Sequence, residues 1–364
     1  MTDIARRRLA GQRLLGDPFN SPEEAVGGLG AVQAQEYAGA KWALGLRTRD
    51  VTDADIERSF NSGGILRTHA MRPTWHFVLA EDIRWLLELT ASRVKARLAI
   101  YDRHLEIDAA LLRRSRRVLE AALQGRHLIR SELVQVLERA GIVASGQRLG
   151  QLLMHSELDG VVTSGPLRNR QFSYALLEER APRARRLERE EALAELTGRY
   201  FSSHGPAQVQ DFAWWSGLKV ADVRHGLSLL GTALAQDVIA GRSYWSSPDA
   251  VGEAPAGGPY LHLLPNYDEF LVAYRDRSAA LARGRFDRAV LGRGSILADI
   301  VILDGQVLGA WRRRRQGGQV IVEVSELVIE EAGSRPVREA ADRLERFLGV
   351  PVTLTGAPFG AFGT

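Results

Sequence analysis

The fold is decided by residues 108–176, DAALLRRSRRVLEAALQGRHLIRSELVQVLERAGIVASGQRLGQLLMHSELDGVVTSGPLRNRQFSYAL. Asp108 is suited to cap a helix that we expect to continue to about residue 123. Ser131 begins a second, shorter helix, and Ser145 introduces a third. This stretch therefore predicts three consecutive short helices.

A two-stranded hairpin is expected directly after these helices. Apolar and polar side chains alternate over residues 161–176, around a basic tip at residues 165–170. Three helices followed by a basic-tipped hairpin have the element order of a winged helix, whose third helix usually enters the major groove of DNA.

The same order recurs on both sides of this stretch. Before it, Ser21 and Thr52 each open a helix, and residues 65–78 alternate as a hairpin. After it come helices near residues 188–230 and strands near residues 234–246, in a looser match. The repetition predicts three tandem winged-helix units.

The last third of the chain has a different pattern. Residues 248–259 have the composition of a linker, and strand patterns near residues 300–324 lie beyond them. We therefore expect a separate, β-rich α+β domain at the C-terminus, in a protein that is mostly α with β wings. The predicted boundaries are 1–105, 106–180 and 181–250 for the three winged-helix units and 259–364 for the C-terminal domain.

The composition of this 364-residue chain excludes several classes of protein. It contains no Cys, so disulfides, thiolate nucleophiles and Cys-based metal sites are absent. No apolar run is long enough for a transmembrane helix, and the N-terminus lacks the apolar core of a signal peptide. We expect a cytoplasmic, nucleoid-associated monomer.

The basic residues are strongly biased toward arginine. Lys occurs only at positions 41, 95 and 219, so 45 of the 48 basic residues are Arg. The planar guanidinium suits phosphate groups and base edges, but the codon usage of a GC-rich genome produces the same bias. Arginine content alone leaves both explanations open.

Familiar catalytic motifs are missing. The sequence has neither a Walker A loop nor a G-x-S-x-G elbow, and no two His stand four residues apart. We therefore expect neither a cofactor nor a metal ion.

One short motif, Gln33-Ala34-Gln35, remains at the end of the helix that Ser21 opens. Side chains two residues apart diverge on a helix but share one side of an extended strand. Because Gly27, Gly28 and Gly30 weaken the preceding helix, we expect extended backbone and converging amides here. The alternative is a pair of surface amides without a role.

The surroundings of this motif resemble the AlkZ-type winged-helix DNA glycosylases, bacterial enzymes that release N7-alkylated purines and unhook interstrand crosslinks. The resemblance rests on segments in the family's order that span residues 30–315, nearly the whole chain. These segments are residues 31–42, 67–68, 71–78, 199–206, 211–217, 263–277, 304–311 and Arg312. The resemblance implies three tandem winged helices around a concave DNA-binding face, followed by a β-rich domain.

The resemblance also implies catalytic roles for Gln33 and Gln35, which fill the family's Q-x-Q signature. A base alkylated at N7 is cationic and leaves without a general acid, so the protein has only to supply a water molecule. Two amide oxygens could hold that water and place negative dipole ends near the developing sugar cation. No lysine lies near enough for a Schiff base, since the nearest is Lys41, so we expect a monofunctional enzyme.

Asp268 and the pair Trp214-Trp215 each have two possible roles. Asp268 could support the sugar cation or form a structural ion pair with an Arg, and the pair Trp214-Trp215 could stack on bases or lie in the core. The candidate DNA-binding residues, at the predicted hairpins, third helix and basic segments, are Arg72, Trp75, Arg148, His155, Arg242, Arg277, Arg312 and Arg313.

The expected partner is double-stranded DNA carrying alkylated purines. The leading hypothesis is a glycosylase for N7-alkylguanine, bulky adducts and possible crosslinks included. The alternative is a winged-helix regulator or architectural protein without catalytic activity. An RNA-binding module is disfavoured, because no strand carries the aromatic pattern of an RNA-recognition motif.

Overall fold

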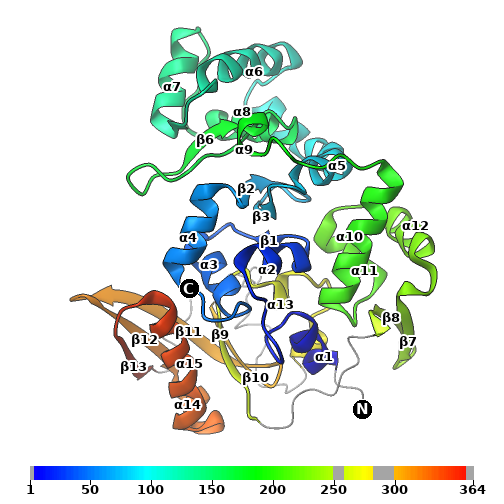
Figure 1. The fold of residues 1–364 in the computed structure, drawn as a ribbon, viewed down its shortest axis with the longest axis vertical. Coiled ribbons are helices and arrows are strands. Elements are labelled where there is room, and N and C mark those ends of the chain that lie inside the picture. Colours follow the sequence, from blue (N-terminus) through cyan, green and yellow to red (C-terminus); the bar gives the residue numbers. More distant parts are fainter. Residues whose placement is uncertain (1–3, 249–257, 282–298, 358–364) are drawn as a thin grey trace.

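The computed structural model describes residues 4–248, 258–281 and 299–357. It is mostly helical, with four small sheets among the described residues. Figure 1 shows α6 and α7 at one end of the long axis, α10 to α12 on one side, and the C-terminal sheet at the other end.

The first unit follows a short helix, α1 (Ile4–Gly11). Its first helix begins as predicted, because the Ser21 hydroxyl accepts a hydrogen bond from Glu24 N and Pro22 occupies the first turn. Its three strands form a sheet in the order β1-β3-β2. The elements are α2 (Pro22–Leu29), β1 (Val32–Gln33), α3 (Tyr37–Gly45), α4 (Asp53–Ser62), β2 (Ile65–His69) and β3 (Trp75–Leu79).

The second unit repeats this arrangement element by element. Asp108 caps its first helix as expected, and its sheet has the equivalent order β4-β6-β5. The long helix α5 (Ile83–His104), which the sequence patterns did not indicate, connects it to the first unit. The elements are α6 (Ala109–Leu123), β4 (Leu128–Ile129), α7 (Arg130–Arg139), α8 (Gly146–Leu158), β5 (Val162–Ser164) and β6 (Ser173–Leu176).

The third unit keeps the order but reduces the first strand to a single bridge. Ala207 pairs with Trp245 in place of that strand, so the sheet proper has two strands. A short helix, α9 (Leu177–Arg180), precedes the unit. The elements are α10 (Arg189–His204), α11 (Val209–Ser216), α12 (Val220–Leu230), β7 (Ala235–Ile239) and β8 (Arg242–Ser246).

The C-terminal region contains a five-stranded sheet in the order β13-β12-β11-β10-β9. Strands β12 and β13 run parallel, and the other neighbours are antiparallel. The elements are β9 (Leu261–Leu264), α13 (Glu269–Val272), a 3-10 turn (Ser278–Ala280), β10 (Ile300–Leu303), β11 (Gln306–Gln316), β12 (Gln319–Ser325), α14 (Glu326–Ala332), α15 (Ser334–Leu348) and β13 (Val352–Ala357).

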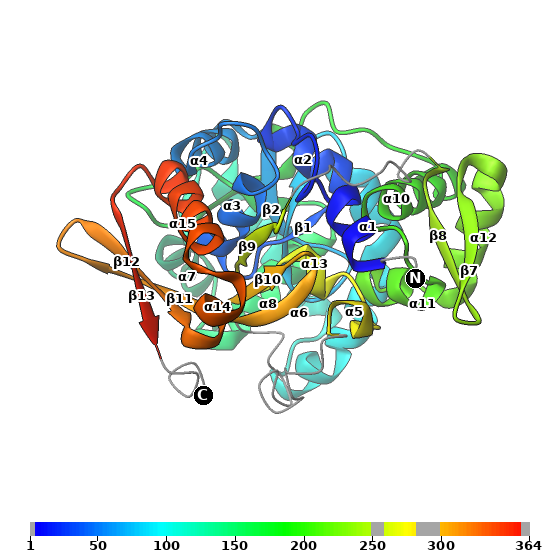
Figure 2. The same ribbon diagram turned by 90° about the horizontal axis from the view of Figure 1, so that it is seen from below.

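The described residues of this region, which was expected to form a separate domain, share buried apolar clusters with the N-terminal part of the chain. One buried apolar cluster contains residues of α2, α3 and α4 together with residues of the C-terminal sheet and α15. The Trp42 indole on α3 donates to Leu263 O on β9 at 2.7 Å, and α15 lies against α3 and α4 (Figure 2). The predicted linker at 248–259 falls almost entirely outside the described residues.

Candidate active site

Gln33 ends the short strand β1, as the glycines predicted, whereas Gln35 lies in the bend between β1 and α3. Helix α2 ends at Leu29, and Gly30 leaves the helix with a φ of 80°. Gln33 then pairs with His76 on β3, and Ala34 N donates to Trp75 O at 2.7 Å. Gln33 is 6% exposed, and Gln35 is exposed.

The two amide oxygens are held by the connection between β2 and β3. Gln33 Oε1 accepts from Arg72 Nη2 at 2.7 Å, and Gln35 Oε1 accepts from Trp75 N at 3.3 Å. An amide oxygen has two lone pairs. Each oxygen is therefore oriented by one donor and can accept a second hydrogen bond, for example from a water molecule.

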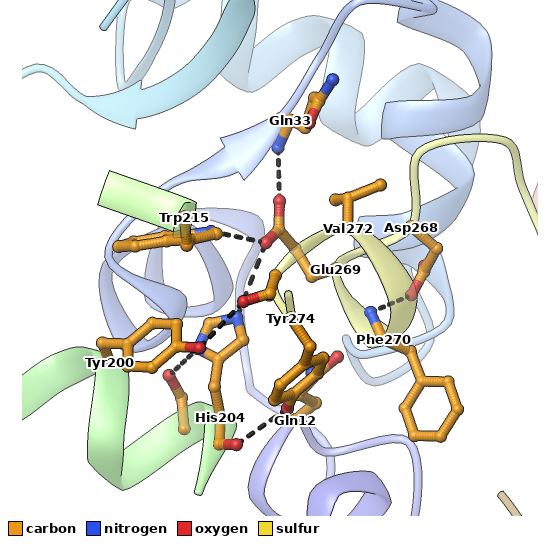
Figure 3. Close-up of polar contacts among 12 residues, drawn as sticks. Gln12, Gln33, Tyr200, His204, Trp215, Asp268, Glu269, Phe270, Val272 and Tyr274 are labelled. Atoms are coloured by element: carbon orange, nitrogen blue, oxygen red, sulfur yellow. Dashed lines mark hydrogen bonds and ion pairs between the residues drawn. The ribbon is translucent and has the colours of Figure 1, made fainter. Parts of the chain in front are cut away.

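A buried carboxylate, Glu269, lies directly behind Gln33 (Figure 3). Its Oε1 accepts from Gln33 N at 2.7 Å, and its Oε2 accepts from Trp215 Nε1 at 2.8 Å. His204 Nε2 lies 3.6 Å from Glu269 Oε2, and both side chains are fully buried. The C-terminal region thus supplies an acceptor for the main chain of the motif.

Glu269 is held in its ionised form. Burial by itself raises the pKa of this carboxyl, but the close approach of His204, the hydrogen bond from Gln33 N and the nearby charge of Arg72 outweigh burial and lower it. Burial lowers the pKa of His204, so that ring is neutral at pH 7. The base of the strand therefore carries a fixed negative charge in a dry environment.

Asp268, which the sequence offered either as a support of the sugar cation or as a structural ion pair, lies next to this carboxylate in the chain. Asp268 makes a two-point ion pair with Arg47, at 2.7 and 2.8 Å, with both side chains 1% exposed. The Asp268 carboxylate also caps α13 by accepting from Phe270 N. The ion-pair reading of Asp268 is therefore the one that the structure supports. Glu269 could have been chosen only from the Tyr-Asp-Glu segment, which offers two adjacent acids.

Two predicted DNA-binding residues, Arg72 and Arg277, meet at the exposed ring of Trp214. The Cζ atoms of Arg72 and Arg277 lie 6.0 and 5.8 Å from the ring centroid of Trp214. Trp214 is 42% exposed, whereas Trp215 is fully buried beside Glu269. The core reading of the tryptophan pair is thus correct for Trp215 and wrong for Trp214.

The groove-facing reading of Arg148 and His155 is wrong. His155 Nε2 lies 2.9 Å from Asp102 Oδ1 on α5, and Arg148 Nη1 donates to Leu105 O just beyond α5 at 2.8 Å. At their spacing on α8 the two side chains share one face. That face packs on α5, the helix that was not anticipated.

Of the remaining candidates, Trp75 contacts the motif through its own main chain, whose N–H donates to Gln35 Oε1. Trp75 is half-buried against the His69 ring, with ring centroids 3.9 Å apart. Arg242 begins β8 beside the hairpin tip, as expected, and pairs with Asp276 at 2.6 Å.

The basic run at 312–315 lies within β11, just before the turn that joins this strand to β12. Arg312 pairs with Glu323 on β12 at 2.5 Å, and the turn is formed by Gly317 and Gly318. Arg313 is half-buried in the same strand. Because β11 is 11 residues long, its basic side chains lie beside the neighbouring strand β12 and can pair with it. Side chains at a hairpin tip have no such neighbour.

Neither a metal centre nor a membrane-spanning helix is present among the described residues. In that part of the chain no group of three or more His, Asp or Glu is placed to hold a metal ion. No helix there combines the length and apolarity needed to cross a membrane.

Comparisons with known proteins agree with this architecture. A family model described as DNA glycosylase AlkZ-like matches residues 26–347. A curated protein of Streptomyces sahachiroi, named interstrand DNA cross-link repair glycosylase, is 24% identical over 314 residues, which cover 82% of this chain and 85% of that protein.

The solved structure of Streptomyces sahachiroi DNA glycosylase AlkZ is similar in fold. It superposes with a TM-score of 0.77 at 22% identity, covering 98% of this chain and 100% of that one. At this identity the likeness describes the fold alone.

Proposed function

Because the chain belongs to the AlkZ-like DNA glycosylase family, we propose that it hydrolyses the N-glycosidic bond of N7-alkylated guanine in duplex DNA. Membership of the family confirms the expected enzyme class, a DNA glycosylase. The proposal adds the lesion and assigns Gln33 and Gln35 the task of orienting the attacking water.

The chemistry needs little acid or base strength. Alkylation at N7 gives the base a positive charge, so breaking the glycosidic bond releases a neutral base and leaves positive charge on the sugar. The oxygens of Gln33 and Gln35 accept hydrogen bonds from the water and place it below C1′, which is catalysis by positioning. Arg72 fixes the orientation of the Gln33 amide by donating to its oxygen.

Glu269 has a positioning and electrostatic role in this proposal. It is fully buried behind the main chain of Gln33, so we assign it no direct proton transfer from the attacking water. Its charge acts through a dry interior, where a fixed charge stabilises developing positive charge more strongly than in water. The hydrogen bond from Gln33 N also fixes the position of the Gln33 main chain relative to the carboxylate.

We also propose that the enzyme is monofunctional. A lyase reaction would need an amine close to C1′, and Lys41 is 5% exposed and paired with Asp53 at 2.7 Å. Its ammonium is thus held by a carboxylate on α4 and is not available to attack C1′ of the sugar.

The arrangement on DNA extends the proposal. The three repeated units are winged helices that together surround the duplex. The protein acts as a monomer in the cytoplasm, on the nucleoid. The curated relative is named for interstrand DNA cross-link repair, and we extend the substrates of this chain to bulky and cross-linked N7 adducts.

The observation that carries the proposal is the pair of amides beside Arg72 and in front of the ionised Glu269. The test is release of free base from duplex DNA containing N7-methylguanine, followed by chromatography under single-turnover conditions. We expect Gln35→Ala, at an exposed position, to slow release by about 10²-fold while leaving the melting temperature unchanged. The matched control is Gln124→Ala, which removes an exposed amide at the end of α6.

Equal release by the wild type and Gln35→Ala would remove the motif from the mechanism. Absence of release by the wild-type protein, together with tight duplex binding, would favour the alternative of a winged-helix regulator.

A further inference from the structure

A cavity of about 600 Å³ lies apart from the Q-x-Q site, between the N-terminal segment, the end of α3 and helix α15. Figure 2 shows α15 beside α3 on this side of the molecule. The proposed glycosylase chemistry uses none of the cavity's side chains. Those that decide its chemistry are Arg13, Trp42, Arg49, Asp50, His262, Arg343, Arg346 and Phe347.

The cavity is strongly basic. Four arginines line it, and Asp50 is its single carboxylate. Arg49 approaches Asp17 only at 4.0 Å, with both side chains largely exposed. Arg343 and Arg346 on α15 form no ion pair with any residue in the described ranges. Glu339 offsets part of the positive charge at Arg343, but burial and the charge of Arg346 outweigh it.

Several buried polar atoms at this cavity have no partner. His262 is 5% exposed, and neither of its ring nitrogens has a hydrogen-bond partner among the described residues. Arg343 Nε is unpaired in the same sense, while its Nη2 donates to Leu261 O. A buried donor without an acceptor costs free energy, so these atoms indicate that a ligand supplies acceptors here.

The charges of the neighbours fit an anion. Burial and then the positive charges of Arg343 and Arg47 lower the pKa of His262 well below its ordinary value, so the empty cavity holds a neutral imidazole. Burial also lowers the pKa of Arg343, with a further contribution from Arg346. A bound anion would relieve the repulsion between these groups.

We propose that this cavity binds a phosphorylated small molecule, whose phosphate is held by Arg343, Arg346 and His262. Guanidinium forks match phosphate oxygens in two-point hydrogen bonds, and a neutral imidazole can donate one more. A volume of about 600 Å³ exceeds what a single phosphate needs and falls within the range of ligand sites. The buried rings of Trp42 and Phe347 form an apolar wall for the remainder of the ligand.

Calorimetric titration of the full chain with pyrophosphate tests the site. We expect saturable binding to the wild type and at least about tenfold weaker binding to Arg346→Gln, because each lost charge-assisted hydrogen bond contributes that much. Arg346 is exposed, so its replacement should not unfold the protein. Arg343→Gln should weaken binding further, and its fold is checked by circular dichroism.

The matched control is Arg335→Gln, which changes an 89% exposed arginine on the same helix that pairs with Glu339. Equal affinity of the wild type and Arg346→Gln, or no binding to the wild type, would overturn the proposal.

A second measurement separates a small phosphorylated ligand from a phosphate of the DNA backbone. For a small-molecule site, pyrophosphate binds equally well with saturating duplex present, and Arg346→Gln leaves the salt dependence of duplex affinity unchanged. If the duplex displaces pyrophosphate, or if the variant lowers the salt slope by about one, the cavity is a DNA contact and the proposal is wrong.

Discussion

The first and second units have the same element order and differ in how one main-chain N–H is satisfied. Gln33 on β1 and Ile129 on β4 occupy the same place, each pairing with the last strand of its sheet. Gln33 N donates to Glu269, a buried carboxylate 236 residues away, at 2.7 Å. Ile129 N donates to Glu132, a local carboxylate three residues away, at 2.8 Å.

This difference separates a scaffold from a site. A local glutamate in the first turn of a helix is an ordinary cap, and solvent screens its charge. A remote, fully buried glutamate is surrounded by a medium of low dielectric constant. Its negative charge therefore interacts more strongly with nearby positive charge. The repeated fold can therefore carry chemistry in the unit against which the C-terminal region packs.

The largest expected effect concerns the ion pair that anchors the C-terminal region to the first unit. Asp268→Ala leaves Arg47 buried without its partner, so the free energy of unfolding should fall by about 3–5 kcal/mol. Urea denaturation measures this loss. If Asp268→Ala has normal stability but no longer releases the base, Asp268 has a catalytic role and the prediction is wrong.

The partners of the two strands predict different responses to acid. Gln33 pairs with His76, whereas Ile129 pairs with Ser173, which does not titrate. Burial lowers the pKa of His76 to about 3. The native ring stays neutral while the unfolded chain takes up a proton below about pH 6.5, so stability is full above that pH and falls toward about pH 3.

Between about pH 6.5 and pH 4 this histidine should remove on the order of 3 kcal/mol from the free energy of unfolding. Urea titrations across that range, on the wild type and on His76→Asn, measure the slope. The control is His225→Asn, since His225 is about half exposed. A slope that His76→Asn does not reduce would contradict the prediction.

Exchanging the two carboxylates for amides compares the units directly. Glu269→Gln removes the buried charge and should slow release of N7-methylguanine by about 10²-fold, corresponding to about 2.7 kcal/mol. Glu132→Gln removes a half-buried cap that also pairs with Arg168, and should leave the release rate unchanged. Similar rates for both variants would show that the remote carboxylate acts only as a structural acceptor.

The smallest effect is expected at the exposed ring beside the motif. Trp214→Ala should weaken binding of lesion-containing duplex by about 1 kcal/mol, because a flat ring flanked by Arg72 and Arg277 suits contact with a base or sugar. Fluorescence anisotropy measures the affinity, and Trp214→Phe should retain most of it. If Trp214→Ala binds the duplex with unchanged affinity, the Trp214 ring does not contact DNA and only packs against the two arginines.

Much of the fold could be predicted from local patterns. The caps at Ser21 and Asp108 and the hairpin at residues 161–176 are found where the sequence placed them. Each depends on interactions between residues close in the chain, so a short window contains the necessary information. The strand that ends at Gln33 was predictable for the same reason.

The errors share a different cause. Arg148 and His155 were placed in a groove because the helix that covers them, α5, was not anticipated. The choice between Asp268 and Glu269 depended on Arg47, which lies more than 200 residues earlier in the chain. Neither pairing leaves a signal in the sequence around the residue concerned.

The amino-acid sequence by itself determined the repeated order of helices and hairpins and the strand at Gln33, since capping, glycine placement and alternation act over a few residues. Only the tertiary structure decided which carboxylate lies behind those amides, which tryptophan is exposed, and which arginines are neutralised. Those outcomes depend on burial and on charge pairing across the whole chain. Both properties arise when distant segments exclude water together.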